Sequence, residues 1–283
     1  MNESIACALG ALLLYGVADF VYKRGATAGA QPHQFLMVQT WFFTSLAFLY
    51  GLVSGTLVFG AGTLWGAAAG VLVVIGYYNF AWSLRHGSVS TNATIFRLSF
   101  AVTVALAVLL LGEALTPAKL AGLALALVAV WLLLGAPDSA GRADAESRAS
   151  LARVLLATVA VGIASFTYKL GLRAGAAPVS LVAAQGAVAV ALATAFAARL
   201  DGGVRPSRAA LTHAPVAAVL LVAAFILLAK GLQAGEVSVI VPIAQMGFVV
   251  TALLGFLLLR EPFTPRKGAG LAAAVAALAS LTR

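Results

Sequence analysis

Two charged side chains, Asp19 and Arg97, lie inside long apolar stretches of this chain of 283 residues. A charge at the centre of a membrane-spanning helix costs at least about 2.5–3.5 kcal/mol, so each charge needs a partner or water. In one interpretation Asp19 lines a solute cavity, where it binds a cationic group or carries a proton. In the other it forms a structural pair with Lys23, which follows one helical turn later.

Arg97 also has two interpretations. Its guanidinium suits a solute carboxylate, which it would hold by two parallel hydrogen bonds. Alternatively, it forms an internal ion pair with Asp19 that joins two helices. An ion pair that opens when a solute binds would satisfy both interpretations, and the two charges would then bracket a zwitterion.

Neutral polar and aromatic side chains elsewhere in the apolar stretches are candidates to complete the cavity. Amides hydrogen-bond a polar solute, and rings with one polar tip suit the wall of an amphipathic site. The alternatives are hydrogen bonds between helices for the glutamines and a place in the interfacial aromatic belt for the tryptophan. The candidates are Gln39, Tyr78, Asn79, Trp82, Gln185 and Gln245.

Pro242 lacks a backbone donor and is expected to kink its helix, either as a hinge or as a static bend.

The composition predicts an integral membrane protein made only of helices. Hydrophobic residues make up 62% of the chain and charged residues 10%, against about 45–50% and about 25% in soluble domains. One span needs about 20 apolar residues, so we expect ten. They run roughly from 4–23, 34–53, 62–84, 89–111, 117–135, 151–170, 178–198, 209–231, 237–259 and 265–281. The net charge of +9 is spread over short loops, which argues against a nucleic-acid partner.

The chain is an internal duplication. Residues 16–39 match residues 162–185 at 11 of 24 positions when shifted by 146, and residues 87–122 match residues 235–270 at 17 of 36 when shifted by 148. We therefore expect two repeats, residues 1–149 with a polar linker at 136–149, and residues 150–283. Because five spans is an odd number, the repeats should insert in opposite orientations, with a site at their interface.

A Glu-x-x-Thr-Pro motif ends one span and begins the next in each repeat. Threonine is a good helix N-cap and proline suits the first helical position, so we expect tight structural hairpins, with each glutamate paired to a nearby lysine, Lys119 or Lys267. The residues are Glu113, Thr116, Pro117, Glu261, Thr264 and Pro265.

Gly62, Gly66 and Gly70 are spaced for close helix packing, inside the bundle or, alternatively, in a dimer contact.

The loop charges predict the orientation. With the N-terminus outside, the cytoplasmic loops carry 12 lysines and arginines, and with it inside they carry 5. The positive-inside rule therefore predicts that both termini lie outside.

Several signatures of catalysis are missing from the sequence. There is no Gly-x-x-x-x-Gly-Lys-Ser/Thr phosphate loop, no Cys/His metal spacing and no nucleophile motif. We expect neither an enzyme nor a cofactor.

The pattern Gly-x-x-x-Phe-x-x-Lys at 16–23 and the motif Leu-Gly-Glu-Ala-Leu-Thr-Pro at 111–117 both recur in the second half. Together they resemble the drug/metabolite transporter superfamily, specifically its ten-span type with two EamA-like repeats. The resemblance implies a ten-helix bundle around a central cavity that moves metabolites by alternating access. It also implies export, as in many bacterial members.

We therefore expect a secondary active exporter of small polar or amphipathic metabolites, such as amino acids, in a bacterial-type inner membrane. Its expected partners are a small-molecule solute, a coupling proton and the lipid bilayer. A membrane scaffold or accessory subunit without flux, in which Asp19–Arg97 is a structural bridge, is the alternative. The oligomeric state stays open, with a monomer favoured.

Overall fold

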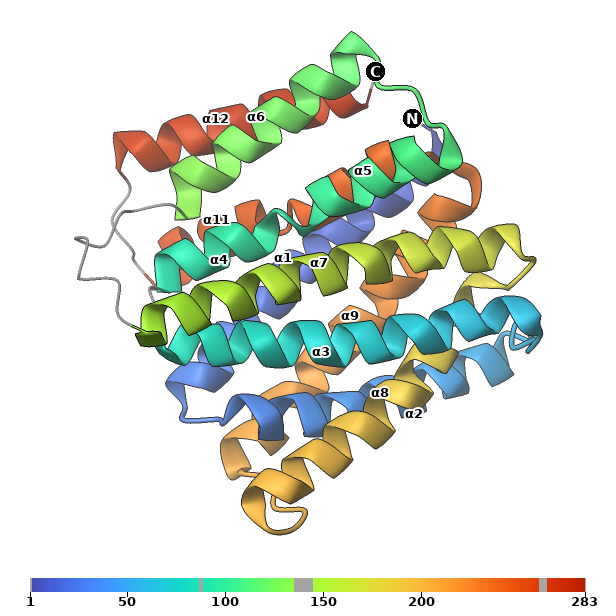
Figure 1. Ribbon diagram of the computed structural model, residues 1–283, viewed down its shortest axis with the longest axis vertical. Coiled ribbons are helices and arrows are strands. Elements are labelled where there is room, and N and C mark those ends of the chain that lie inside the picture. The colour runs from blue at the N-terminus through green and yellow to red at the C-terminus, as the bar shows by residue number, and fades with distance from the viewer. Residues whose placement is uncertain (1, 87–88, 135–144, 260–263, 283) are drawn as a thin grey trace.

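The chain folds into a bundle of helices in the computed structural model, which describes residues 2–86, 89–134, 145–259 and 264–282 (Figure 1). Every regular element in those ranges is a helix, as the composition predicts. The elements are α1 (Glu3–Thr27), α2 (Pro32–Val53), the 3-10 turn η1 (Ala61–Thr63), α3 (Leu64–His86), α4 (Val89–Arg97), α5 (Ser99–Leu111), α6 (Pro117–Leu134), α7 (Ala145–Arg173), α8 (Pro178–Asp201), α9 (Arg208–Ala234), α10 (Val237–Gln245), α11 (Phe248–Leu259) and α12 (Pro265–Leu281).

Within the described residues, nine stretches are long and apolar enough to cross a membrane. Ten were expected. The tenth corresponds to α12, which has 17 residues, fewer than the about 20 that a straight span needs. By their length and composition, these stretches indicate an integral, multi-pass membrane protein.

Two of the expected spans are each broken into two helices. The first breaks at Leu98, between α4 and α5, and the other breaks at Met246 and Gly247, between α10 and α11. The two breaks are equivalent under the 148-residue shift. Pro242 lies inside α10, before the break, but Thr94 occupies its place in α4. Proline is therefore not the common cause of the two breaks.

The common feature is a backbone contact with a glycine of the duplicated motif. A Cβ atom on Gly16 would lie 2.4 Å from the carbonyl oxygen of Gly247, and one on Gly162 would lie 2.7 Å from that of Ser99. These contacts are equivalent in the two repeats. Only glycine allows the first helix of each repeat to approach a broken helix this closely.

Equivalent threonines reinforce these contacts. The Thr251 hydroxyl donates to the Gly16 carbonyl at 3.0 Å, and the Thr103 hydroxyl donates to the Gly162 carbonyl at 2.8 Å. Each hydroxyl finds its hydrogen-bond acceptor within the protein, as polar groups in the bilayer core must because water is absent there.

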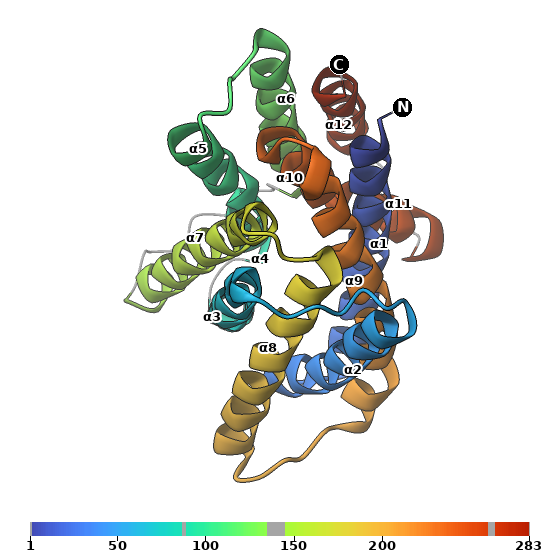
Figure 2. The ribbon, with the colours of Figure 1, turned by 90° about the vertical axis from the view of Figure 1, so that its right-hand side faces the viewer.

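The two halves interlock. Helix α3 packs on α7 of the other half, and α9 packs on α1 in the same manner. The equivalent helices α2 and α8 pack together, as do α6 and α12, which form one edge of the bundle in Figures 1 and 2. Both termini lie near each other in these views.

Equivalent helices that touch run antiparallel. Gly122, near the start of α6, meets Leu281 at the end of α12, whereas Gly270, near the start of α12, meets Leu133 at the end of α6. Helices α2 and α8 follow the same rule. At one end His33 bonds Asp201, and further along Trp41 donates to Thr194 at 2.8 Å.

The glycines of the third span pack inside the bundle. A Cβ atom on Gly62 would meet the carbonyl oxygen of Ala174, one on Gly66 that of Leu181, and one on Gly70 that of Gln185. These contacts join the third span to α8 and to the end of α7, so the glycines do not form an external dimer face.

The two hairpin threonines lie at helix N-caps. Thr116 accepts from the Lys119 amide and Thr264 from the Lys267 amide, each at 3.3 Å. Pro117 and Pro265 occupy the first positions of α6 and α12.

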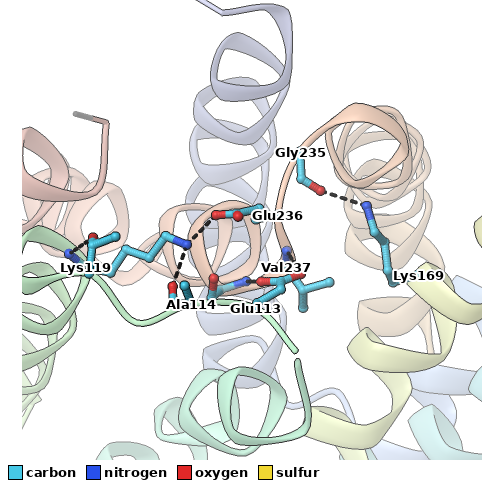
Figure 3. A network of polar contacts seen from close by, with 9 residues as sticks. Glu113, Ala114, Lys119, Lys169, Gly235, Glu236 and Val237 are labelled. Atoms are coloured by element: carbon cyan, nitrogen blue, oxygen red, sulfur yellow. Dashed lines mark hydrogen bonds and ion pairs between the residues drawn. The ribbon is translucent and has the colours of Figure 1, made fainter. Parts of the chain in front are cut away.

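The expected Glu113–Lys119 pair is replaced by two other contacts. Glu113 accepts the backbone amides of Val237 and Ser238, both at 2.8 Å, and so caps the N-terminus of α10 (Figure 3). Lys119 forms an ion pair with Glu236 instead. At the start of α10 the carboxylate satisfies two free helix amides, where the helix dipole also favours a negative charge. Glu261 lies outside the described residues.

Gly66→Val tests the contact between α3 and α8. The new Cβ would lie 2.4 Å from the Leu181 carbonyl oxygen, which belongs to the backbone and cannot rotate away. We expect a loss of about 1–3 kcal/mol, seen as a lower apparent melting temperature of the purified protein in detergent.

The matched control is Gly60→Ala, because no atom lies within 4 Å of a Cβ at Gly60. Equal melting temperatures for the Gly66 variant, the control and the parent protein would contradict the close contact of α3 with α8 at Gly66.

Candidate functional site

A cavity lies between helices of both halves, and Asp19 and Arg97 are on its wall. Most of the remaining wall is aromatic or apolar. The lining residues used below are Tyr15, Asp19, Tyr22, Val73, Tyr77, Arg97, Val161, Ser165, Tyr168, Gln185, Leu221, Phe225 and Gln245.

The cavity is small in this conformation. The space open to water inside it is about 40 Å³, room for a few water molecules at about 10–15 Å³ each. A metabolite would need the walls to move apart.

Asp19 and Arg97 form an ion pair, in which the guanidinium donates to the carboxylate. Asp19 comes from the middle of α1, and Arg97 is the last residue of α4, at the helix break. The side chains keep 29% and 20% of their surface exposed. Partial exposure to a cavity with room for water lowers the free-energy cost of placing both charges among membrane helices.

The cavity wall is built from equivalent positions of the two repeats. Six pairs related by the shifts of 146 or 148 residues line it together. They are Tyr15/Val161, Asp19/Ser165, Tyr22/Tyr168, Val73/Leu221, Tyr77/Phe225 and Arg97/Gln245. Both charges come from the first half, and neutral polar residues take their places in the second. The wall is therefore symmetric in position and asymmetric in charge.

Gln39 and Gln185 meet at a second, adjoining cavity. Both line it, and Gln185 also lines the first cavity. Gln185 accepts a hydrogen bond from the Tyr168 hydroxyl at 2.8 Å. Gln245, which is the equivalent of Arg97 in the second repeat, lines the first cavity. All three sequence-predicted glutamines therefore belong to one connected region.

Tyr78, Asn79 and Trp82 lie outside the lining of both cavities. Asn79 accepts from the Arg153 guanidinium at 3.1 Å, and the same guanidinium lies 4.3 Å from the centre of the Trp82 ring. The Tyr78 ring packs edge-on against Phe196. These side chains hold α3 to α7 and α8, and their neighbour Tyr77 lines the cavity instead.

Pro242 is buried in α10 and is absent from the lining.

Sequence reasoning missed most of the aromatic wall. Tyr77, Tyr168 and Phe225 look like ordinary membrane-helix residues when taken singly. The duplication was the available signal, because four of the six lining pairs keep an aromatic ring or a polar group in both halves. The sequence did not indicate which side of α3 faces α1 and the cavity.

Comparison with known proteins agrees with this geometry. A model of the EamA-like transporter family matches residues 3–135 and 149–283. A solved crystal structure superposes with a TM-score of 0.83 at 18% identity, over 99% of this chain and 96% of that one. At that identity the likeness concerns the fold alone. Among proteins with curated descriptions, none matches.

The family match covers both halves of the chain and nearly all its length, and its members are membrane transporters. This protein therefore belongs to the EamA-like transporter family.

Proposed function

We propose that this protein is a secondary active transporter that exports small polar or amphipathic metabolites, such as amino acids, across a bacterial-type inner membrane. The observation that carries the proposal is the Asp19–Arg97 ion pair on the wall of a cavity between membrane helices. The direction follows from the family resemblance.

The chemistry of the wall favours a zwitterion with an apolar side chain. Asp19 would bind the ammonium group and Arg97 the carboxylate, once the solute has separated them. Gln185 and Gln245 supply amide hydrogen bonds nearby, with Gln39 in the adjoining cavity. The aromatic rings would cover the apolar part of the solute.

The architecture we propose is ten spans in two inverted five-span repeats, residues 1–149 and 150–283, with α12 as the tenth span. Antiparallel contacts between the equivalent helices α2 and α8, and between α6 and α12, support it. Inverted repeats around a central site are the basis of alternating access in many transporters. We propose that a monomer is sufficient, since the cavity is lined by one chain.

Coupling to a proton follows from the charges. When Asp19 is ionised, it can bind the ammonium group of the solute while Arg97 holds the carboxylate. When Asp19 carries a proton, it no longer attracts the ammonium group, and the solute is released. Proton and solute would therefore compete for Asp19, as export in exchange for protons requires.

The second candidate is a membrane scaffold or accessory subunit without flux. It is favoured by the ion pair being fully formed between α1 and α4, as a purely structural bridge would be.

Asp19→Asn tests the transport role. Asparagine keeps the shape of the side chain but carries neither charge nor an exchangeable acid proton, so we expect a folded protein without proton-driven transport. The measurement is amino-acid flux in proteoliposomes with an imposed pH gradient.

Glu3→Gln is the matched control, because Glu3 is an exposed acid on the same helix, away from the cavity. Normal gradient-driven flux in the Asp19→Asn protein would contradict the coupling role.

The double change Asp19→Arg with Arg97→Asp separates the two candidates. A scaffold needs only an ion pair and should keep its melting temperature and its fold. A transporter should keep its fold but lose the rise in melting temperature that a bound amino acid gives, because the two charges now face the wrong ends of the zwitterion. A thermal-shift screen against proteinogenic amino acids measures both, and undiminished ligand stabilisation in the swapped protein would refute the zwitterion site.

We propose from the loop charges that both termini lie outside. A cysteine added at the C-terminus of a Cys7→Ser protein should then react with a membrane-impermeant thiol reagent in intact cells. If the cysteine reacts only after the cells are permeabilised, the termini lie inside and the proposed orientation is wrong.

A further inference from the structure

One tyrosine–glutamine bond joins α7 to α8 beside the cavity. The Tyr168 hydroxyl donates to the Gln185 side-chain oxygen at 2.8 Å, and the two residues are only 1% and 3% exposed. Tyr168 lies five residues before the end of α7 (Arg173), and Gln185 lies seven residues after the start of α8 (Pro178). Those helix ends belong to the face of the bundle that also holds the start of α1 and the end of α12, which we call the terminal face.

The duplication supplies the same pair toward the opposite face. Tyr22 lies five residues before the end of α1 (Thr27), and Gln39 lies seven residues after the start of α2 (Pro32). The spacing and the residue types are identical to those of Tyr168 and Gln185. The hydrogen bond, however, is not made.

Both halves of the missing bond are buried. The Tyr22 hydroxyl oxygen and the Gln39 side-chain oxygen each lack a hydrogen-bond partner among the described residues. A buried polar atom left without a partner is costly, so it calls for an explanation. A counterpart state, in which these two atoms bond each other, is a single explanation for both.

Other polar contacts also hold the terminal face together. The Lys169 ammonium donates to the Gly235 carbonyl oxygen at 2.8 Å (Figure 3). It also donates to the Leu232 carbonyl oxygen at 2.6 Å. The Lys119–Glu236 ion pair lies beside it. Position 88, which is equivalent to Glu236, is a serine and cannot supply a carboxylate.

We propose that Tyr168–Gln185 is the closed gate of the cavity toward the terminal face, that Tyr22–Gln39 is the corresponding gate toward the opposite face, whose hydrogen bond is not made in this structure, and that the two bonds exchange during transport. The inference rests on the proposed function and names the residues that alternate. In the counterpart state, Tyr22 bonds Gln39 while Tyr168 and Gln185 separate.

The exchange conserves the number of hydrogen bonds. One tyrosine–glutamine bond is made in each state, between the same chemical groups, so the gates themselves favour neither state strongly. Such a balance is what alternating access requires, because a small differential affinity of the solute can then move the equilibrium.

The α2–α8 pair is the fixed partner in this exchange. At one end, His33 and Gln34 of α2 both bond Asp201 of α8. At the other end, the loop after α2 is held to α8, where Ser180 accepts the Val58 amide at 2.9 Å. Because both glutamines of the gates lie on this pair, the two tyrosines alternate by movement of α1 and α7 against it.

The test uses a cysteine reporter in the cavity. Cys7 is the only cysteine of the chain, and Cys7→Ser with Ser165→Cys places one thiol on the cavity wall. Among the described residues, the Ser165 hydroxyl bonds only within its own helix, to the Val161 carbonyl at 3.1 Å, so the change is mild. The rate of reaction with a membrane-impermeant thiol reagent is then measured from each face, in right-side-out and inside-out vesicles without solute.

Tyr168→Phe and Tyr22→Phe are the matched variants, since each removes one oxygen atom from an equivalent position. Tyr168→Phe breaks the closed gate and should raise the reaction rate from the terminal face about fivefold, the effect of one ordinary hydrogen bond. Tyr22→Phe removes a bond that exists only in the counterpart state, and should lower the same rate. Gln185→Met, which removes the acceptor, should act like Tyr168→Phe and serves if that variant does not fold.

Shifts of opposite sign support the gates, and shifts of the same sign, or none, overturn them. The assay needs neither solute nor flux, so it stands apart from the transport measurement. A protein that transports but shows no opposite shifts would refute the gates alone. Opposite shifts in a protein that carries no flux would refute the proposed function but would still support the exchange of the two hydrogen bonds.

Discussion

The Asp19–Arg97 ion pair is the interaction around which the cavity is organised. Two charges among membrane helices are tolerated only if they meet each other and some water, and the small cavity offers both. The break after Arg97 ends α4 at this point and brings the guanidinium against α1. If the pair were lost, each charge would keep only the small cavity to stabilise it, and the protein would lose part of its stability.

The duplication explains how the cavity is positioned. Gly16 and Gly162 let the first helix of each repeat pack closely against the broken helix of the other repeat. Hydrogen bonds from Thr251 and Thr103 stabilise these two contacts. Equivalent residues of both halves then face one space. What differs between the halves gives the site its chemistry, because Ser165 and Gln245 stand where Asp19 and Arg97 do in the first half. A symmetric frame therefore carries an asymmetric site.

Much of the fold was predictable from the sequence. Hydropathy predicts the helices within a few residues, and the recurrence of the glycine motif and of the Thr-Pro hairpins predicts the duplication. The break at Leu98 was not predictable, since no proline or glycine marks it. Near the other break, Pro242 was expected to kink its helix, but it lies inside α10, four residues before Met246. Glu113 was expected to pair locally but caps α10, more than one hundred residues away, a contact that only the tertiary fold creates.

The site was predictable in part, for a physical reason. Charges and amides inside apolar runs stand out, so Asp19, Arg97 and the glutamines were found. Helices that are apolar on all sides do not indicate which side faces inward, and so Tyr78 was expected in the cavity where Tyr77 lies. In our proposal, whether Tyr168 bonds Gln185 or Tyr22 bonds Gln39 depends on the conformational state, and this structure has the first bond only. No sequence records which state is adopted.

The central claim is that the ion pair opens around a solute. The most direct measurement is an experimental structure with the amino acid that stabilises the protein most in the thermal-shift screen. The account predicts that its ammonium group contacts Asp19, its carboxylate contacts Arg97, and the two side chains no longer touch. A bound amino acid elsewhere in the protein, with the Asp19–Arg97 pair intact, would contradict it.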